Sequence, residues 1–557
     1  MRKGILLLLS FLFLSSIAFT QGNISTLFEK DRWNISKNEI HGGHLFQNHS
    51  SIHPYLQHRI LNEFENPTVS GNENIVRNNY EYFHYQNDSI VSKINEANKN
   101  RKFLHFFNTY PGHFYSIYRP DFYISIDPLL DISGGFDLVN KKKVLNNSRG
   151  IRLKIGIDNK VFLFSEILET QTKPIEYIDD YANNYKAFPG AGFVKSYSSK
   201  IFNINNGYDY LLANGGIMFR ATKHIDVTFA HSENFIGQGI RSLLISNAGA
   251  PCFYLKLNSQ FGRFNYQNIF SELSSENRFI NDVDKLLQKK YLAAHYLSLN
   301  IGKNWNIGLF ESVVFNRKKG FELQYLNPII FYRAIEQAVG SPDNVLIGFQ
   351  SHINLMHRFS IYGQFILDEF VLNRVITNNE GWWANKYGFQ FGLKYPDFLG
   401  IKSLNIQSEF NVVRPYTYSY SDSIANYSHY HQSLAHPLGS NFEELIGRIN
   451  YSIGHKAFVQ LQFMLYSKGL DSTNSNFGGN ILKSNTTRVM DYNNKILQGL
   501  DTRVSQAVVQ VSYELFSRTW LDLNLGLRQS SNSILKQKYK WIEVGLRINL
   551  DHRNYEF

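Results

Sequence analysis

The sequence has 557 residues, a formal net charge of +11 and a single cysteine. One cysteine excludes an internal disulfide, and the scattered lysines and arginines form no basic patch of the kind that binds nucleic acid. The chain contains 44 phenylalanines and 34 tyrosines but only 13 prolines and 5 methionines, a composition typical of β-strands with many aromatic side chains.

The first residues predict export. Arg2 and Lys3 precede a short apolar run, and small residues lead to Gln21. This pattern is typical of a secretory signal peptide, so we expect residues 1–20 to be removed. The exported chain is expected to meet outer-membrane lipid, lipopolysaccharide or acidic polysaccharide rather than nucleic acid. No later apolar run is long enough for a spanning helix, so a membrane crossing would require a closed β-barrel.

Residues 21–110 have a different composition from the rest. They are polar and rich in asparagine, histidine and glutamate, with a loose helical spacing over 53–64. We expect a small, partly helical periplasmic segment or plug, and a disordered tail is the alternative.

Strict alternation dominates residues 111–557. In "YGFQFGLKY" (387–395) every second residue is apolar, and the same pattern recurs at 151–158, 224–230, 521–528 and 541–550. Period-two alternation predicts strands with one apolar and one polar face. At about 9–11 residues per tilted strand, the length accommodates about 16–18 strands. The fold class is therefore expected to be all-β, a transmembrane antiparallel β-barrel with short turns at one end and long loops at the other. A soluble β-sandwich is the alternative.

No catalytic or cofactor motif stands out. Gly237 and Gly239 form a Gly-x-Gly after an alternating strand, but Ser242 stands where a dinucleotide loop has its third glycine. We expect these two glycines to form a bend at the barrel rim, where the chain turns inward. The histidines of 429–436 lack an acidic or thiol partner at metal-ligand spacing. The sequence therefore predicts a non-enzyme without metal or cofactor.

Several stretches together resemble a known family. The main one is "IGQGIRSLLISNAGAPCFYLKL" (236–257), and the others are 147–161, 188–195, 326–348, 362–370, 382–395, 414–420 and 434–442. They resemble Wzi-like capsule-assembly barrels, and especially the RemB-type branch associated with gliding motility. The resemblance implies an outer-membrane barrel of about eighteen strands in a Gram-negative bacterium, with a helical periplasmic N-terminal part. It also implies non-catalytic binding of capsular polysaccharide at the cell surface.

The expected function is therefore binding, retention or assembly of surface polysaccharide by a non-enzymatic barrel that serves gliding motility and adhesion. The alternatives are an accessory barrel of a secretion or gliding machine, and a diffusion porin.

Two groups of residues are candidates for the site. The charged candidates, which either pair inside the lumen or hold an anionic sugar, are Arg241, Arg333, Arg414, Glu336, Asp343, Asp368 and Glu369. The aromatic candidates, which either stack on pyranose rings or form an interfacial girdle, are Trp382, Trp383, Tyr416 and Tyr418.

Overall fold

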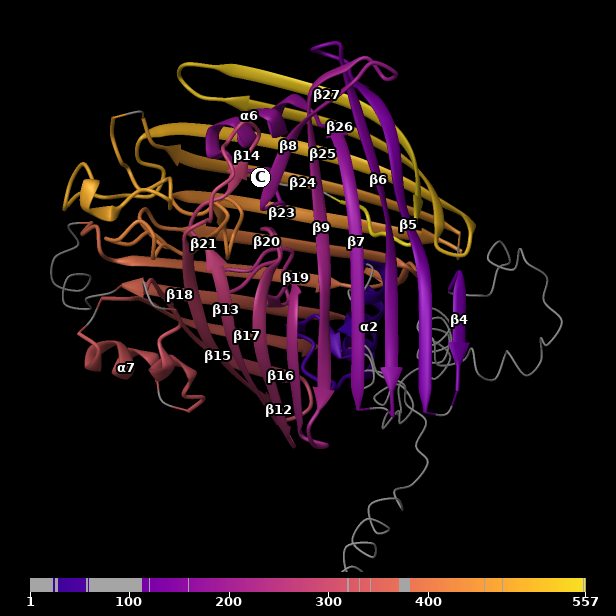
Figure 1. Ribbon diagram of the computed structural model, residues 1–557, viewed down its shortest axis with the longest axis horizontal. Helices are drawn as coiled ribbons and strands as arrows, with labels where there is room; N and C mark the ends of the chain where they lie inside the picture. Colours follow the sequence, from indigo (N-terminus) through magenta and orange to yellow (C-terminus); the bar gives the residue numbers. More distant parts are fainter. Residues whose placement is uncertain are drawn as a thin grey trace, which may run out of the picture.

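The computed structural model describes residues 24–25, 29–56, 59 and 113–557, apart from 120, 159, 318–319, 330, 341, 370–380, 455, 473, 554 and 556. Within these residues, eighteen antiparallel strands close into one barrel (Figure 1). The prediction of an all-β barrel of about 16–18 strands is confirmed. The predicted signal peptide, residues 1–20, lies outside the described residues.

The barrel is built in chain order, with each strand paired to the next. The strands are β5 (Phe122–Asp137), β6 (Lys142–Ile157), β7 (Val161–Lys173), β9 (Ile204–Arg220), β10 (Ile225–Ser232), β12 (Cys252–Phe261), β13 (Phe264–Ser274), β15 (Lys289–Ile301), β16 (Trp305–Phe315), β17 (Asn344–Leu355), β18 (Phe359–Glu369), β19 (Lys386–Tyr395), β20 (Leu404–Val413), β23 (Phe442–Ile453), β24 (Ala457–Leu470), β25 (Leu500–Phe516), β26 (Thr519–Ser531) and β27 (Lys536–Ile548). The ring closes between β27 and β5, where Trp541 lies opposite Asp137. Closure leaves no long unpaired edge, which a barrel in lipid requires.

The alternating sequence separates the two faces of the wall. On β19, Phe389, Phe391 and Leu393 are exposed outside, whereas the residues between them are buried inside. On β26, Leu525 and Leu527 are exposed and Gly526 is buried. Because successive side chains of a strand point to opposite faces, this pattern produces an apolar exterior and a polar interior.

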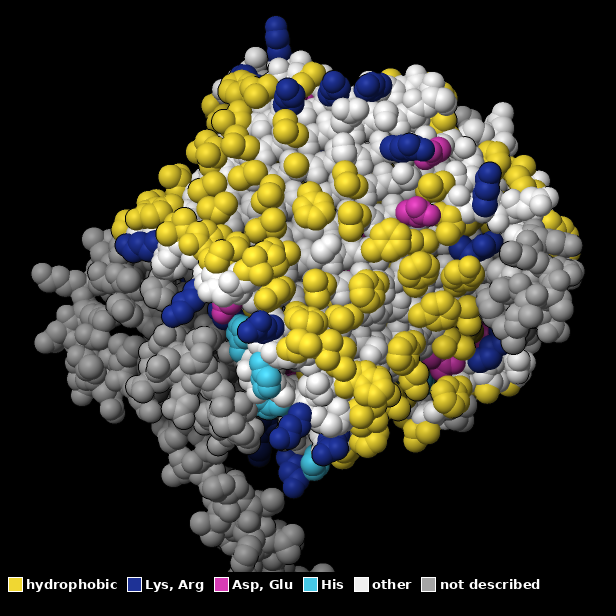
Figure 2. All heavy atoms as spheres, turned by 180° about the vertical axis from the view of Figure 1, so that it is seen from behind, with side chains coloured by type: hydrophobic (Ala, Val, Ile, Leu, Met, Phe, Trp, Pro, Cys, Tyr) yellow, Lys and Arg dark blue, Asp and Glu magenta, His cyan; other side chains and the backbone are white. Residues whose placement is uncertain are grey.

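The exterior is largely apolar. Figure 2 shows hydrophobic side chains spread over the wall seen from behind, with Lys and Arg side chains toward its edges. Exposed apolar side chains of the wall include Phe219, Phe253, Leu309, Phe391 and Leu527. An apolar surface of this extent would promote aggregation in water. A barrel that spans a bilayer needs such a surface, because it contacts the hydrocarbon of the lipids.

The two ends of the barrel differ in the length of their connections. At the turn end, short turns such as 262–263 and 517–518 join neighbouring strands. The long connections at the other end, the loop end, are 174–203, 233–251, 275–288, 316–343, 370–385, 414–441 and 471–499. This asymmetry agrees with the sequence-based expectation.

Short elements lie before the barrel and in the connections between its strands. They are β1 (Ile24–Ser25), α2 (Glu29–Gly42), β2 (Ile52–His53), β3 (Tyr55–Leu56), β4 (Tyr115–Tyr118), α6 (Glu176–Tyr185), β8 (Phe193–Ser199), β11 (Phe235–Ile236), β14 (Arg278–Phe279), η3 (Leu323–Leu326), α7 (Tyr332–Ala338), η4 (Phe398–Gly400), β21 (Ser428–His429), β22 (Gln432–Ser433) and η5 (Asn485–Thr487). Among the described residues, no helix is both long and apolar enough to cross a bilayer. The helical spacing over 53–64 is misleading at its start, because β2 pairs with β11 and β3 with β1.

The segment around α2 lies against the turn end of the barrel. Lys37 Nζ on α2 is 2.7 Å from a carboxylate oxygen of Asp397, in the turn between β19 and β20. His41 Nδ1 lies 2.9 Å from the carbonyl oxygen of His357, in the turn between β17 and β18. Two turns therefore hold the helix.

Candidate functional site

Three segments of the chain occupy the interior of the barrel. The first is 29–56, whose β2 pairs with β11 in the connection 233–251. The second is that connection, which we call the inner loop. The third follows β27 and reaches α6, where the Tyr177 hydroxyl donates to the carbonyl oxygen of Tyr555 at 2.9 Å; Figure 1 places the end of the chain beside α6. These segments together fill much of the lumen.

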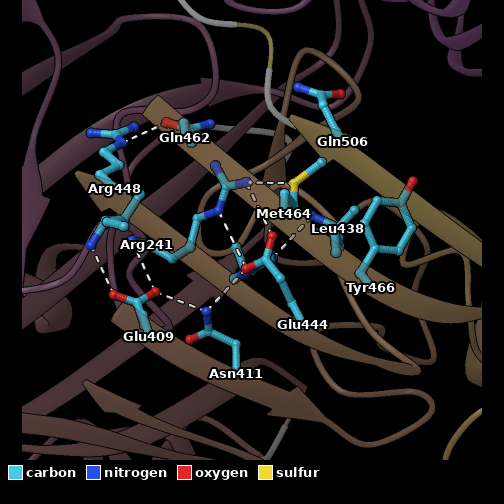
Figure 3. A network of polar contacts seen from close by, with 12 residues as sticks. Arg241, Glu409, Asn411, Leu438, Glu444, Arg448, Gln462, Met464, Tyr466 and Gln506 are labelled. Carbon is cyan, nitrogen blue, oxygen red and sulfur yellow. Dashed lines mark hydrogen bonds and ion pairs between the residues drawn. The ribbon is translucent and has the colours of Figure 1, made fainter. Parts of the chain in front are cut away.

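The inner loop is bound to the wall by two carboxylates (Figure 3). Glu409 of β20 accepts hydrogen bonds from the backbone N–H groups of Ile240, at 2.8 Å, and Arg241, at 3.2 Å. The Arg241 guanidinium donates to Glu444 of β23 at 3.1 Å. Arg241 is 5% exposed and Glu444 is 1% exposed. Because both charges are buried and paired, removing one partner would leave the other uncompensated.

Two further polar contacts strengthen this network. Asn411 donates to Glu409 at 2.8 Å and to Glu444 at 3.0 Å, so it bridges the two carboxylates. His436, in the connection 414–441, places Nε2 2.7 Å from Glu444. Burial lowers the pKa of His436, although Glu444 acts in the opposite direction. A neutral His436 therefore donates to Glu444 and ties a second long connection to the same point.

Glycine is required where the inner loop bends. Gly237 has a φ of +152°, and a Cβ there would lie 2.6 Å from the Gln364 amide nitrogen. A Cβ on Gly239 would meet the Glu409 carboxylate. Both wall partners lie in the middle of their strands, β18 and β20, so the bend is deep in the lumen rather than at the predicted rim. Close approach of backbone to wall explains the two glycines.

The predicted arginines do not meet in one site. Arg241 pairs with Glu444 and with none of the four carboxylates proposed for it from the sequence. Arg333 on α7 does pair with Glu336, at 3.0 Å, but its side chain is 56% exposed. The Arg414 guanidinium makes long contacts, of 3.4–3.5 Å, with two backbone carbonyl oxygens and lies 5.4 Å from the Tyr387 ring centroid. The three side chains therefore have separate surroundings.

The remaining predicted carboxylates hold loop-end structure together. Asp343 pairs with Arg317 at 2.6 Å. Asp368 and Glu369, at the end of β18, lie 3.1 Å and 3.3 Å from the buried Lys386 amine. Each carboxylate is engaged by a neighbouring cation, which indicates a structural role.

The predicted aromatic candidates are mostly covered. Tyr416 is 1% exposed and Tyr418 0%, and each hydroxyl donates to a backbone carbonyl at 2.8 Å. Neither ring presents a face to a ligand, which corrects the sequence-based expectation for these two tyrosines. Trp382 and Trp383 are partly exposed, but the Arg488 guanidinium lies 4.1 Å from the Trp383 ring centroid. One face of that ring is already occupied.

A cavity of about 430 Å³ lies among α6, the wall from β24 to β27 and from β5 to β9, the inner loop and the segment after β27. Many of its polar lining residues are amides, namely Asn146, Asn214, Asn247, Gln460, Gln462, Gln506, Gln510 and Asn524. Tyr177, Tyr210 and Trp541 add aromatic surface. A second cavity of about 280 Å³ shares Arg32 and His552 with the first, so the two adjoin.

Some of the charges that line the larger cavity are paired within the protein, whereas Asp131, Glu233 and Glu543 also line it. Arg152 lies 2.7 Å from Glu166, and Asp522 lies 2.7 Å from Arg547. The lining amides can both donate and accept hydrogen bonds. Some already accept from arginines, Gln462 from Arg448 at 2.6 Å and Gln506 from Arg528 at 2.6 Å. Such a lining can hold a hydroxyl-rich, uncharged ligand by paired hydrogen bonds and ring contact.

The amides of this cavity were not among the sequence candidates. Gln460 and Gln462 stand two residues apart in "VQLQF" (459–463), and Gln506 and Gln510 share a face of β25. The sequence pattern that could have identified them is a repeated amide at alternating positions of successive strands. The pattern is visible in the sequence, but only the pairing of the strands shows that the amides lie together.

No protein-family profile matches the sequence, and a search of curated proteins found no relative. Among solved structures, the chain is similar to Wzi, an outer-membrane carbohydrate-binding β-barrel involved in group 1 capsule assembly in Escherichia coli. The TM-score is 0.55 at 10% identity, over 96% of this chain and 100% of that chain. The chain is also similar to Pseudomonas aeruginosa OprD, with a TM-score of 0.41 at 8% identity over 76% of this chain and 94% of that one. At this identity, the similarity to Wzi shows the barrel fold alone.

Proposed function

We propose that this chain is a non-enzymatic barrel of the outer membrane of a Gram-negative bacterium that binds surface polysaccharide and helps to retain or assemble it. The observation that carries the proposal is the lumen cavity lined by amides and aromatic rings. Additional support is the similarity over nearly the whole chain to Wzi, a carbohydrate-binding barrel.

The proposed orientation follows from the connections. The loop end faces the cell exterior and the turn end faces the periplasm, as in barrels with short periplasmic turns. Residues 1–20 act as a cleaved signal peptide, and residues 21–110 form a periplasmic segment or plug, of which 29–56 enters the turn end of the barrel. Residues 111–557 form the barrel.

The proposed contact is made by cross-strand amide pairs. Gln460 on β24 and Gln510 on β25 lie directly opposite one another and both line the cavity. A pair of amides facing one sugar unit satisfies both the donor and the acceptor of neighbouring hydroxyls. Trp541, which lines the same cavity, supplies apolar surface that covers a sugar ring.

The proposed assignment to a branch of the family is based on two stretches of the sequence. We place the chain in the RemB-type branch on the resemblance of 236–257 and 326–348, and we propose that polysaccharide binding serves adhesion during gliding. The support is sequence resemblance, and loss of surface spreading in a strain without the protein would test it.

The test is direct binding to a glycan array. Detergent-purified protein is applied to an array of bacterial capsular and surface polysaccharides, and the strongest glycan is then titrated. Replacing the facing pair, Gln460→Leu with Gln510→Leu, is expected to weaken binding at least about tenfold, because each lost sugar hydrogen bond is worth about 1 kcal/mol.

The matched control replaces another cross-strand amide pair. Asn258 and Gln267 face each other on β12 and β13, are buried, and line neither cavity. Asn258→Leu with Gln267→Leu is expected to leave binding unchanged. Absence of glycan binding by the unaltered protein, or equal binding by the cavity variant, contradicts the proposal.

A further inference from the structure

The outer faces of β25 and β26 form an apolar band. From Ala507 to Leu515 on β25, and from Leu521 to Leu527 on β26, every outward residue is apolar or aromatic. At about 3.3 Å per residue, the β25 stretch covers about 26 Å along the strand, which suits the apolar band of a spanning barrel. This band defines where the hydrocarbon of the bilayer meets these strands.

Polar residues replace the apolar ones toward the loop end. The strand registers place two successive outward rows across β24 to β27: Ser467, Arg503, Ser531 and Lys536, then Leu465, Ser505, Gln529 and Lys538. Lys540 lies beside Leu527, the last residue of the apolar band. The cations of β25 and β27 therefore stand where lipid head groups meet the wall.

A groove lies in the same rows. It has a volume of about 370 Å³ and is lined on one side by apolar residues, Phe410, Leu445 and Leu465. Arg503, Ser505, Ser531 and Gln529 line its other side. The groove exists because the serine side chains are small. Between one outward row and the next, its lining changes from apolar residues to cationic and hydroxyl-bearing ones.

We propose that this groove, together with Lys536, Lys538 and Lys540, binds a phosphorylated lipid of the leaflet that surrounds the loop end. An acyl chain lies along the apolar side, and the phosphate contacts Arg503 and the lysines. The proposal needs the barrel to span a membrane but does not depend on polysaccharide binding in the lumen.

The charges around the groove favour an anion. The Arg503 side chain is 74% exposed and therefore accessible, although Asp501 lies 3.2 Å from its guanidinium. Glu443 lines the groove near the same row. Four cations, counting the three lysines of β27, stand against Asp501 and Glu443, because Glu444, which also lines the groove, is paired with Arg241. A phosphate therefore meets a net positive surface.

The probe is lipid A that carries two phosphates. Detergent-purified protein is titrated with it and the bound lipid is counted by native mass spectrometry. Lys536→Gln, Lys538→Gln and Lys540→Gln together are expected to weaken binding at least about tenfold, because three of the cations that attract the phosphates are removed. Arg503→Gln alone is expected to weaken it by a smaller factor.

The control removes the same charge from the other end of the barrel. Lys160, Lys303 and Lys456 are exposed in turn-end turns, and their replacement by glutamine is expected to leave binding unchanged. Equal loss in this control contradicts a site at the groove. If fully dephosphorylated lipid A binds as tightly as lipid A with two phosphates, phosphate recognition is contradicted. If inorganic phosphate displaces lipid A from the protein, the groove is a simple anion site and the lipid proposal is overturned.

Discussion

Arg241 of the inner loop and Glu444 of β23 form a buried ion pair of 3.1 Å in the middle of the barrel. The loop reaches across the lumen to make it, because Gly237 and Gly239 allow the backbone to lie against the wall. The same carboxylate receives His436 from another long connection. Glu444 therefore anchors two connections that begin at the loop end. Substitutions at this ion pair test whether these connections close the lumen.

Breaking this pair is expected to loosen the inner loop. Arg241→Met leaves Glu444 buried without its cation, so we expect a loss of about 3–5 kcal/mol in the free energy of unfolding and a higher ion conductance in planar bilayers. Arg241→Met combined with Glu444→Leu removes both charges and is expected to recover much of the lost stability. Lys285→Met, which removes the solvent-exposed Lys285–Glu276 pair in the connection 275–288, is the control and is expected to change neither quantity appreciably. Unchanged conductance in the single variant would show that the loop is held by other contacts.

Adding one methyl group to Gly239 is expected to disturb the same loop. The new Cβ would lie 2.5 Å from the Arg241 carbonyl oxygen, and backbone atoms cannot give way cheaply. We expect Gly239→Ala to lower the free energy of unfolding by about 1–3 kcal/mol, measured by denaturant titration in detergent. The control is Gly134→Ala on β5, where no heavy atom lies within 4 Å of the added Cβ. Similar losses in both variants would count against close approach as the reason for Gly239.

The barrel was predictable from the sequence because alternation is a local property. Phe389, Phe391 and Leu393 mark the exterior of β19 without knowledge of any partner strand. The strand count followed from chain length divided by strand length. The placement of residues 29–56 in the turn end was not predictable, because α2 is held by Asp397 and His357, more than 300 residues away in the sequence.

The candidate site was predictable only in part. Arg241 was expected either to pair in the lumen or to hold an anionic sugar. It pairs with Glu444, which was not among the expected carboxylates, since pairing depends on how deeply the inner loop folds. Tyr418 was expected to present a ring and is instead buried under the inner loop, with its hydroxyl bonded to the Leu243 carbonyl. Gln460 and Gln510 meet because neighbouring strands β24 and β25 pair, whereas only closure of the ring brings Asn146 of β6 and Asn214 of β9 to the same cavity.

Glycan binding is expected to depend on the lumen rather than on Trp383. The Arg488 guanidinium lies 4.1 Å from the Trp383 ring centroid and covers one face of it. We therefore expect Trp383→Ala to change polysaccharide affinity by less than about twofold, compared with at least about tenfold for the facing Gln460 and Gln510 pair. Affinity is measured by titration of the same array glycan. A larger loss of affinity in Trp383→Ala would indicate that the glycan binds at the loop end and not in the lumen cavity.

The docking of α2 is expected to weaken in acid. Burial alone would raise the pKa of Asp397, but hydrogen bonds from His41 and Lys37 outweigh it and lower the pKa to about 2. Because the folded pKa lies below the ordinary value, the stabilisation is complete above about pH 4 and decreases as the pH falls toward 2. Asp397→Asn removes the charge at every pH, so at pH 7 we expect faster hydrogen exchange in 29–42 and little change in the barrel strands. Asp158→Asn, at another turn-end turn, is the control. If residues 29–42 exchange equally slowly in Asp397→Asn and in the unaltered protein at pH 7, this carboxylate does not hold the helix.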